Sequence, residues 1–207
     1  MIARRDDRGT TLAEMAVVMV VSGVVAALAA QFVIAIARDA NTATVAANRV
    51  DSVRLAVDSV DRQVRSGDVL YIEPPGSTCS AYGSGSNCLR IATEADGATS
   101  CVQLQLVPDP AGDGSYDLRA RTYSPGWASG GAVGPWRQVT NGLAGPTSAA
   151  PPFSLGQQSG VGSQALTVQF AAPQTSATAA PIKLTATYVP RNALYASSTT
   201  CSGGAPA

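Results

Sequence analysis

An apolar run from Met15 to Ala37 constrains this chain more than any other feature of its sequence. The run contains no charged residue, and only Ser22, Gly23 and Gln31 interrupt it with polar or helix-weakening side chains. At a rise of about 1.5 Å per residue, a helix of this length crosses a hydrocarbon core of about 30 Å. The sequence therefore predicts one membrane-spanning helix near the N-terminus.

Glu14 stands on the first turn of this predicted helix, immediately before the apolar run. An ionisable group at the edge of the membrane is costly unless another group neutralises it. Such a residue is by default a functional candidate, and its partner has to be named. Glu14 is accordingly the first candidate site residue.

Glu14 belongs to the segment Gly9-Thr10-Thr11-Leu12-Ala13-Glu14-Met15, which follows a short basic leader. This segment resembles the type III signal of type IV prepilins and type II secretion pseudopilins. In that family a membrane peptidase cuts after the glycine and N-methylates the new first residue, and the apolar helix packs in the core of a filament. The resemblance implies cleavage after Gly9, methylation at Thr10 and a role in assembly for Glu14. Thr10 departs from the pattern, since the family usually has phenylalanine there.

The pairing that the resemblance implies for Glu14 is physically reasonable. A free amine at Thr10 would be positive near neutral pH, and Glu14 of a neighbouring subunit would attract it strongly in a medium of low dielectric constant. Such pairing would set the axial register between otherwise featureless apolar helices. Small residues would let these helices approach closely; they are Ala16, Gly23, Ala26, Ala27, Ala29 and Ala30.

Two other interpretations of the N-terminal segment stay open. One is a plain signal anchor whose glutamate lies at the membrane edge by chance. The other is a secretory signal peptide cleaved after Ala27-Leu28-Ala29, which satisfies the A-x-A rule, although the apolar run continues past it to Ile36.

Arginines before the run predict a cytoplasmic N-terminus, with everything after Ala37 exported.

From Arg38 to Ser66 the pattern remains helical but becomes amphipathic. Five valines recur at a spacing of three and four residues and form one apolar stripe; they are Val50, Val53, Val57, Val60 and Val64. No proline precedes Pro74, so one helix is predicted from Thr10 to Ser66. The predicted organisation is a leader (1–9), a membrane-spanning half of the helix (10–37), an amphipathic half (38–67) and a β-rich head (68–207).

After Gly67 the apolar period changes to two, which indicates strands. The predicted strands are Asp68–Glu73, Cys88–Thr93, Cys101–Val107, Tyr116–Tyr123, Trp136–Thr140, Leu166–Phe170 and Ile182–Val189. Pro108–Ser115 and Asn141-Gly142 read as hairpins or loops, and Gly142–Gln164 and Ala171–Pro181 as low-complexity loops. We expect an α+β fold in which the long helix packs on an antiparallel sheet through its valine stripe.

The cysteines predict disulfides. All four, Cys79, Cys88, Cys101 and Cys201, follow the apolar helix and lie in the part predicted to be exported, where an even count indicates two disulfides with three possible connectivities. Cys79–Cys88 with Cys101–Cys201 is the favoured pairing. Zinc is the competing interpretation, but no C-x-x-C spacing occurs.

Further ligand sites have little support in the sequence. Asp109, Asp113 and Asp117 lie in a glycine-rich loop and offer oxygen ligands for calcium, but they miss the EF-hand spacing, and Asp-Pro and Asp-Gly are ordinary turn sequences. The segment Gly83-Ser84-Gly85-Ser86-Asn87 lacks the lysine of a phosphate-binding loop and predicts a flexible turn. We expect no metal and no cofactor.

An aromatic and basic group in the predicted head could stack on single-stranded nucleic acid or on sugar. It comprises Trp127, Trp136, Arg121, Arg137 and Tyr123. Such aromatics more often fill a sheet core or the edge of a subunit contact. Nucleic acid is therefore a minor candidate partner.

The function expected from these features is structural. The chain would be a minor pilin or pseudopilin of a type IV pilus-like or type II secretion filament, with the membrane, other pilin subunits, a prepilin peptidase and the assembly machinery as partners. It would be a single-pass membrane protein before assembly and extracellular or periplasmic afterwards. The alternative is a membrane-anchored binding module that does not polymerise. An enzyme is not expected, because the chain has no histidine and no nucleophile motif.

Overall fold

The computed structural model describes residues 11–72, 81–82, 85–95, 98–157, 164–173, 180–190 and 201. The chain divides after Val45 into an N-terminal and a C-terminal unit, and these are described separately below. Its elements in chain order are α1 (Leu12–Arg65), β1 (Gly67–Ile72), β2 (Ala81–Tyr82), β3 (Gly85–Ser86), β4 (Cys88–Ala95), β5 (Ala98–Pro108), β6 (Tyr116–Tyr123), the 3-10 helix η1 (Trp127–Ser129), β7 (Arg137–Leu143), β8 (Phe153–Gln157), β9 (Gln164–Ala172) and β10 (Ile182–Tyr188). The predicted α+β class is confirmed.

Helix α1 has 54 residues and nearly the bounds that the sequence predicted. At its C-terminal end Arg65 Nε donates to Asp61 Oδ2 at 2.7 Å, a favourable i,i+4 pair. The chain then turns directly into β1 at Gly67, where a Cβ atom would lie 2.4 Å from Ile91 Cγ2. Only glycine lets β1 start this close to its neighbour β4.

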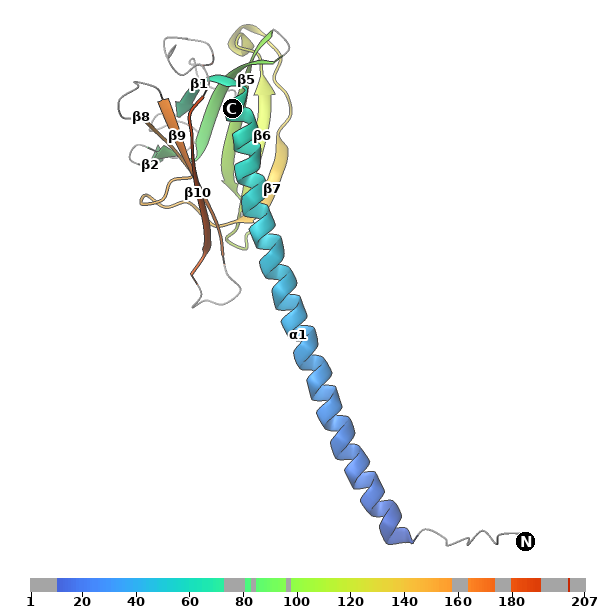
Figure 1. The fold of residues 1–207 in the computed structure, drawn as a ribbon. Helices are drawn as coiled ribbons and strands as arrows, with labels where there is room; N and C mark the ends of the chain where they lie inside the picture. Colours follow the sequence, from blue (N-terminus) through green and yellow to red (C-terminus); the bar gives the residue numbers. More distant parts are fainter. Residues whose placement is uncertain are drawn as a thin grey trace, which may run out of the picture. The chain divides into compact units, whose positions relative to one another are not determined.

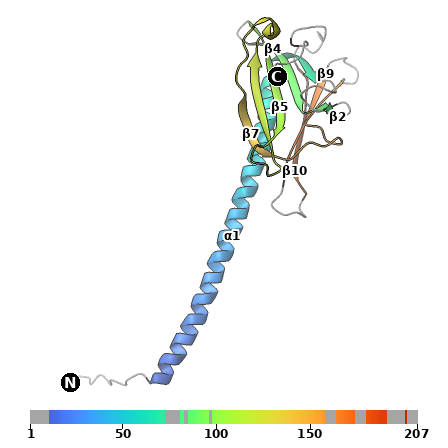
Figure 2. The same cartoon turned by 180° about the vertical axis from the view of Figure 1, so that it is seen from behind.

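The strands of the C-terminal unit form two antiparallel five-stranded sheets (Figure 1), whereas the sequence pattern predicted a single sheet. The first sheet has the order β1-β4-β5-β6-β7 and the second has the order β10-β9-β8-β3-β2. The predicted connection between β5 and β6 is a hairpin, with Pro108 opposite Tyr116. Seen from behind, β5 and β7 lie in front of the last turns of α1 (Figure 2), so the helix covers the opposite face of the first sheet.

One apolar core joins the last turns of α1 to both sheets. Four of the five valines in the predicted stripe are buried there, namely Val53, Val57, Val60 and Val64. They pack with alternate residues of the first sheet (Leu89, Ile91, Val102, Leu104, Leu106, Leu118) and of the second (Phe153, Leu166, Val168, Phe170, Ala172). The stripe therefore packs on strands, as predicted from its spacing.

Strand β8 corrects the prediction that residues 142–164 are a loop without regular structure. Phe153 of this strand is fully buried in the core, and its ring makes an edge-on contact with Phe170, with centroids 5.6 Å apart. The strand is only five residues long and follows two prolines, so the sequence contains little periodicity to reveal it. Gly85–Ser86, within the segment predicted to be a flexible turn, is likewise a short strand that pairs with β8.

Asn141-Gly142 is not a hairpin turn, contrary to the sequence prediction. It lies inside β7, where the register against β6 shifts between Tyr116 and Leu118. Gly142 has φ 69°, so it takes the left-handed conformation that a β-bulge of this kind requires. Asn-Gly occurs in hairpin turns and in β-bulges alike, because both need a residue at positive φ.

Candidate functional site

The carboxylate of Glu14 closes a capping box at the start of α1. The Thr11 backbone N–H donates to Glu14 Oε2 at 2.9 Å, and the Glu14 backbone N–H donates to Thr11 Oγ1 at 3.3 Å. Threonine at the N-cap with glutamate three residues later is the pairing that satisfies two of the unpaired donors of a helix N-terminus. Among the residues that the structure describes, Glu14 therefore has a defined position, and its carboxylate accepts one hydrogen bond.

A hydrogen bond does not neutralise this carboxylate. The Thr11 N–H is a neutral donor, and the partial positive charge of the helix N-terminus corresponds to only about half an elementary charge. The next acidic or basic residue along α1 is Arg38. Glu14 therefore lies at the end of an otherwise uncharged helical surface, and no residue of the described ranges supplies a positive partner for its charge.

The N-terminal unit exposes apolar side chains around its whole circumference. Every residue from Thr11 to Thr44 is exposed, including Leu12, Met15, Val17, Val18, Met19, Val20, Val21, Val24, Val25, Leu28, Phe32, Val33, Ile34 and Ile36. A helix that is apolar on all sides is normally buried in lipid or among other helices. The described part of the chain contains one helix that is long and apolar enough to cross a membrane, and it is α1.

The predicted processing site lies outside the described residues, since Gly9 and Thr10 precede Thr11. The small residues predicted to permit close helix contact do lie on α1. A Cβ atom built on Gly23 would meet no atom within 4 Å beyond its chain neighbours and the backbone of its own helix. The surface around Gly23 is therefore open to a neighbouring helix.

The cysteines tie the end of the chain to the first sheet. Cys101 of β5 forms a disulfide with Cys201, with Cα atoms 5.8 Å apart, which is the pairing favoured from the sequence. The Arg90 guanidinium donates to the Cys201 carbonyl oxygen, and Tyr123 packs on the buried disulfide. Cys88 is also disulfide-bonded, whereas Cys79, its favoured partner, lies outside the described residues.

The three aspartates considered for calcium have separate roles. Asp109 Oδ1 accepts from the Ala111 N–H at 2.7 Å, and Asp113 Oδ1 accepts from the Ser115 N–H at 2.9 Å, as in ordinary Asx turns. Hydrogen bonds from Ser115, first from its side chain and then from its backbone N–H, lower the pKa of Asp113. Asp117 is buried, and its Oδ2 lies 3.4 Å from Arg119. In the part of the chain that the structure describes, no three acidic, cysteine or histidine side chains group as metal ligands.

The aromatic and basic residues of the predicted head are largely used inside the protein. The guanidinium of the buried Arg121 lies over the Trp136 ring at 4.2 Å, and its Nε donates to Gln103 Oε1 at 2.9 Å. Burial lowers the pKa of Arg121. Trp127 packs against the cluster around the Cys101–Cys201 disulfide. Because one face of Trp136 is already covered by Arg121, the arrangement does not favour stacking of a base or a sugar between the two.

Sequence reasoning missed the capping box, although its signal is present. Thr11-Leu12-Ala13-Glu14 directly before an apolar run matches the pattern of threonine followed three residues later by glutamate.

A scan of the chain against protein-family models, and searches against curated proteins and solved structures, find no match.

Proposed function

We propose that this protein is a subunit of a pilus-like or pseudopilus filament that assembles through the apolar half of α1. The observation that carries the proposal is the acidic residue at the start of a helix that is apolar on every side. A lone membrane anchor could use the capping bonds of this residue, but it gains nothing from the negative charge, because burying a charge costs free energy. A helix that packs against copies of itself uses the charge if each copy also brings a cation.

The proposed cation is the amine that cleavage after Gly9 would create on Thr10. Thr10 directly precedes Thr11, whose N–H already bonds to Glu14, so the amine is formed beside the helix end that carries the carboxylate. In a stack of parallel helices, the amine of one subunit would pair with Glu14 of the next. The pair fixes the axial register that apolar contacts alone leave free.

The exported part of the protein supports the same proposal. A disulfide between Cys101 and Cys201 is stable in an oxidising compartment, in agreement with a cytoplasmic N-terminus and export of the residues after α1. We therefore place the unassembled chain in the membrane by a single helix, with processing by a prepilin peptidase before assembly. We also propose that the protein is a minor subunit of the filament.

The test separates the charge of Glu14 from its capping role. Glu14→Gln retains an oxygen that accepts from the Thr11 N–H but removes the negative charge. Thr11→Ala removes the side-chain cap and keeps the charge, at a cost of about 1 kcal/mol in helix stability. Each variant is expressed with the cognate peptidase and assembly machinery, and the fraction of protein in sheared filaments is compared with the total in membranes.

We expect Glu14→Gln to insert into the membrane and to be processed, yet to be largely lost from filaments. Thr11→Ala should be incorporated at close to the wild-type level. Mass spectrometry of the mature N-terminus provides the second readout, where a methylated Thr10 is expected. Equal incorporation of Glu14→Gln and wild type, or a mature chain that begins at Met1, contradicts the proposal and favours a non-polymerising anchored protein.

A further inference from the structure

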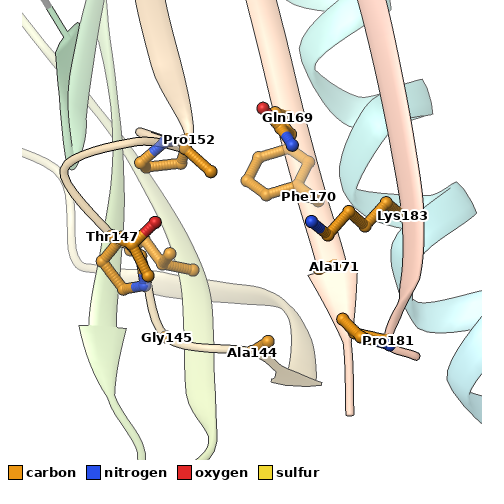
Figure 3. Close-up of a pocket in the computed structure, with 12 residues that line it drawn as sticks. Ala144, Gly145, Thr147, Pro152, Gln169, Phe170, Ala171, Pro181 and Lys183 are labelled. Carbon is orange, nitrogen blue, oxygen red and sulfur yellow. The ribbon is translucent and has the colours of Figure 1, made fainter. Parts of the chain in front are cut away.

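A small pocket opens in the C-terminal unit between the β7–β8 connection and the last two strands (Figure 3). Its volume is about 180 Å³. Three stretches that are distant in sequence line it: Leu106 from β5, the connection from Ala144 to Pro152, and the facing ends of β9 and β10. Backbone bonds between Ala144 and Ala171 and between Gln169 and Pro152, at 2.7 and 2.9 Å, hold these stretches together.

The walls of this pocket are apolar and built from stiff residues. Three prolines, Pro146, Pro152 and Pro181, line it together with Phe170, and the proline ring fixes the φ angle of each. Phe170 is also locked by its contact with Phe153 on the core side. The cavity is therefore formed in advance, and a ligand would not have to order its walls.

The polar groups of the pocket are a single cation and neutral donors. The Lys183 side chain extends toward the space in front of Phe170, on the same side as the Gln169 amide (Figure 3). Lys183 and Gln169 lie on one face of the second sheet, because Lys183 is opposite Ala171 and Thr185 is opposite Gln169. None of the twelve lining residues is acidic, and Lys183 makes no ion pair with any described residue.

The strands of the second sheet offer this cation no acidic partner. Lys183 is the only lysine of the chain, and the sequences of β8, β9 and β10 contain no other charged residue. The last acidic residue in the sequence is Asp117, on the first sheet. Asp58 and Asp61 of α1 act on Tyr188 at the other end of β10, but no acidic side chain lines the pocket. An ammonium group without an acidic partner in its pocket attracts an anion more strongly than a lysine among acidic neighbours does.

We propose that this pocket binds a carboxylate carried on a short apolar body, with the carboxylate on Lys183 and Gln169 and the body against the three prolines. The volume of the pocket limits the size of the ligand. Sites for drug-sized ligands have roughly 300–1,000 Å³, whereas this pocket holds about six non-hydrogen atoms at roughly 30 Å³ for each water-sized group. A short-chain carboxylic acid and the side chain of a polypeptide glutamate share this chemistry and this size.

Because the chain has one lysine, carboxylate binding can be followed at Lys183 itself. Reductive ¹³C-methylation of the full-length protein in lipid nanodiscs labels Lys183 and the N-terminal amine alone, and dimethyl-lysine retains its positive charge. The Lys183 signal is followed by NMR during titration with butyrate, and with butyramide as the neutral probe of the same size. A second pair of titrations uses N-acetyl-glutamate α-amide and N-acetyl-glutamine α-amide.

We expect a saturable shift of the Lys183 signal with at least one carboxylate, and binding of the matching amide about tenfold weaker, since a hydrogen bond to a charged group is lost. Tighter binding of butyrate would identify a free acid as the ligand class, and tighter binding of the blocked glutamate a polypeptide side chain. Equal affinity for acid and amide, or no saturable shift with either acid, overturns the proposal.

A matched variant controls for non-specific attraction to a cation. Lys183→Gln combined with Thr187→Lys moves the charge along the same face of β10, away from the pocket, without changing the net charge. Isothermal titration calorimetry should show that this variant loses carboxylate binding and that Lys183→Arg retains it. Undiminished binding by the relocated lysine also overturns the proposal. Filament assembly through α1 is measured separately, so either proposal can fail without the other.

Discussion

Replacing Phe153 by alanine should destabilise the C-terminal unit more than most single changes, because this ring joins the second sheet to the common core. Phe153 is fully buried, and its ring meets Phe170 at an interplanar angle of 88°. Burial of such a side chain contributes about 1.5–3 kcal/mol, and an edge-on aromatic pair adds about 0.5–1.5 kcal/mol. Together with the cavity left behind, the expected loss is about 3–5 kcal/mol in the free energy of unfolding.

The measurement is a urea titration of the full-length protein in nanodiscs, followed by tryptophan fluorescence. Both tryptophans, Trp127 and Trp136, lie in the C-terminal unit, so the signal reports its unfolding and not that of the membrane-spanning segment. Val133→Ala is the control, since Val133 is 44% exposed and its truncation should change stability by less than about 0.5 kcal/mol.

The reasoning fails if Phe153→Ala lowers the free energy of unfolding by less than about 1 kcal/mol, which is typical of a surface substitution. That result would mean that residues 153–157 are a loop, as their composition suggests, and that β8 does not hold the second sheet to the core. A loss of the expected size with an unchanged slope against urea would support the buried position of β8.

Two further predictions concern the disulfide and a tyrosine at the helix. Cys101→Ala with Cys201→Ala opens a link across a sequence separation of 100 and should lower the free energy of unfolding by about 2–5 kcal/mol; an unchanged urea midpoint would contradict this. Burial, then the charges of Asp61 and Asp58, raise the pKa of Tyr188 above 10.0. Its contribution to stability is therefore fully present below the unfolded-state pKa and is lost as the pH rises through the raised value. Urea midpoints should fall more steeply above about pH 10 for wild type than for Tyr188→Phe, and parallel curves would refute the assignment.

Local patterns in the sequence were enough to predict α1 and most strands. The spacing of its valines predicted which face of α1 is buried, since a helix repeats every 3.6 residues whatever its surroundings. Strand β6 has the bounds Tyr116–Tyr123 that its alternation predicted. The capping box was equally readable, because Thr11 and Glu14 are three residues apart in the chain.

The tertiary structure alone decided how the strands are distributed. Whether β8 pairs with β9 or remains a loop depends on contacts between residues far apart in sequence, such as Phe153 with Phe170. Local propensity is silent on such contacts, since strand preference reflects packing against neighbours more than the chain itself. The same applies to Asn141-Gly142, which is a bulge because β6 lies beside it.

The apolar segment and the acidic residue that precedes it follow from the order of the amino acids, because lipid accepts any helix that satisfies its own backbone and exposes apolar side chains. The pocket at Lys183 does not follow from that order. Leu106, Pro152 and Lys183 meet only because two sheets close over one core, and no periodicity links positions so far apart in the chain.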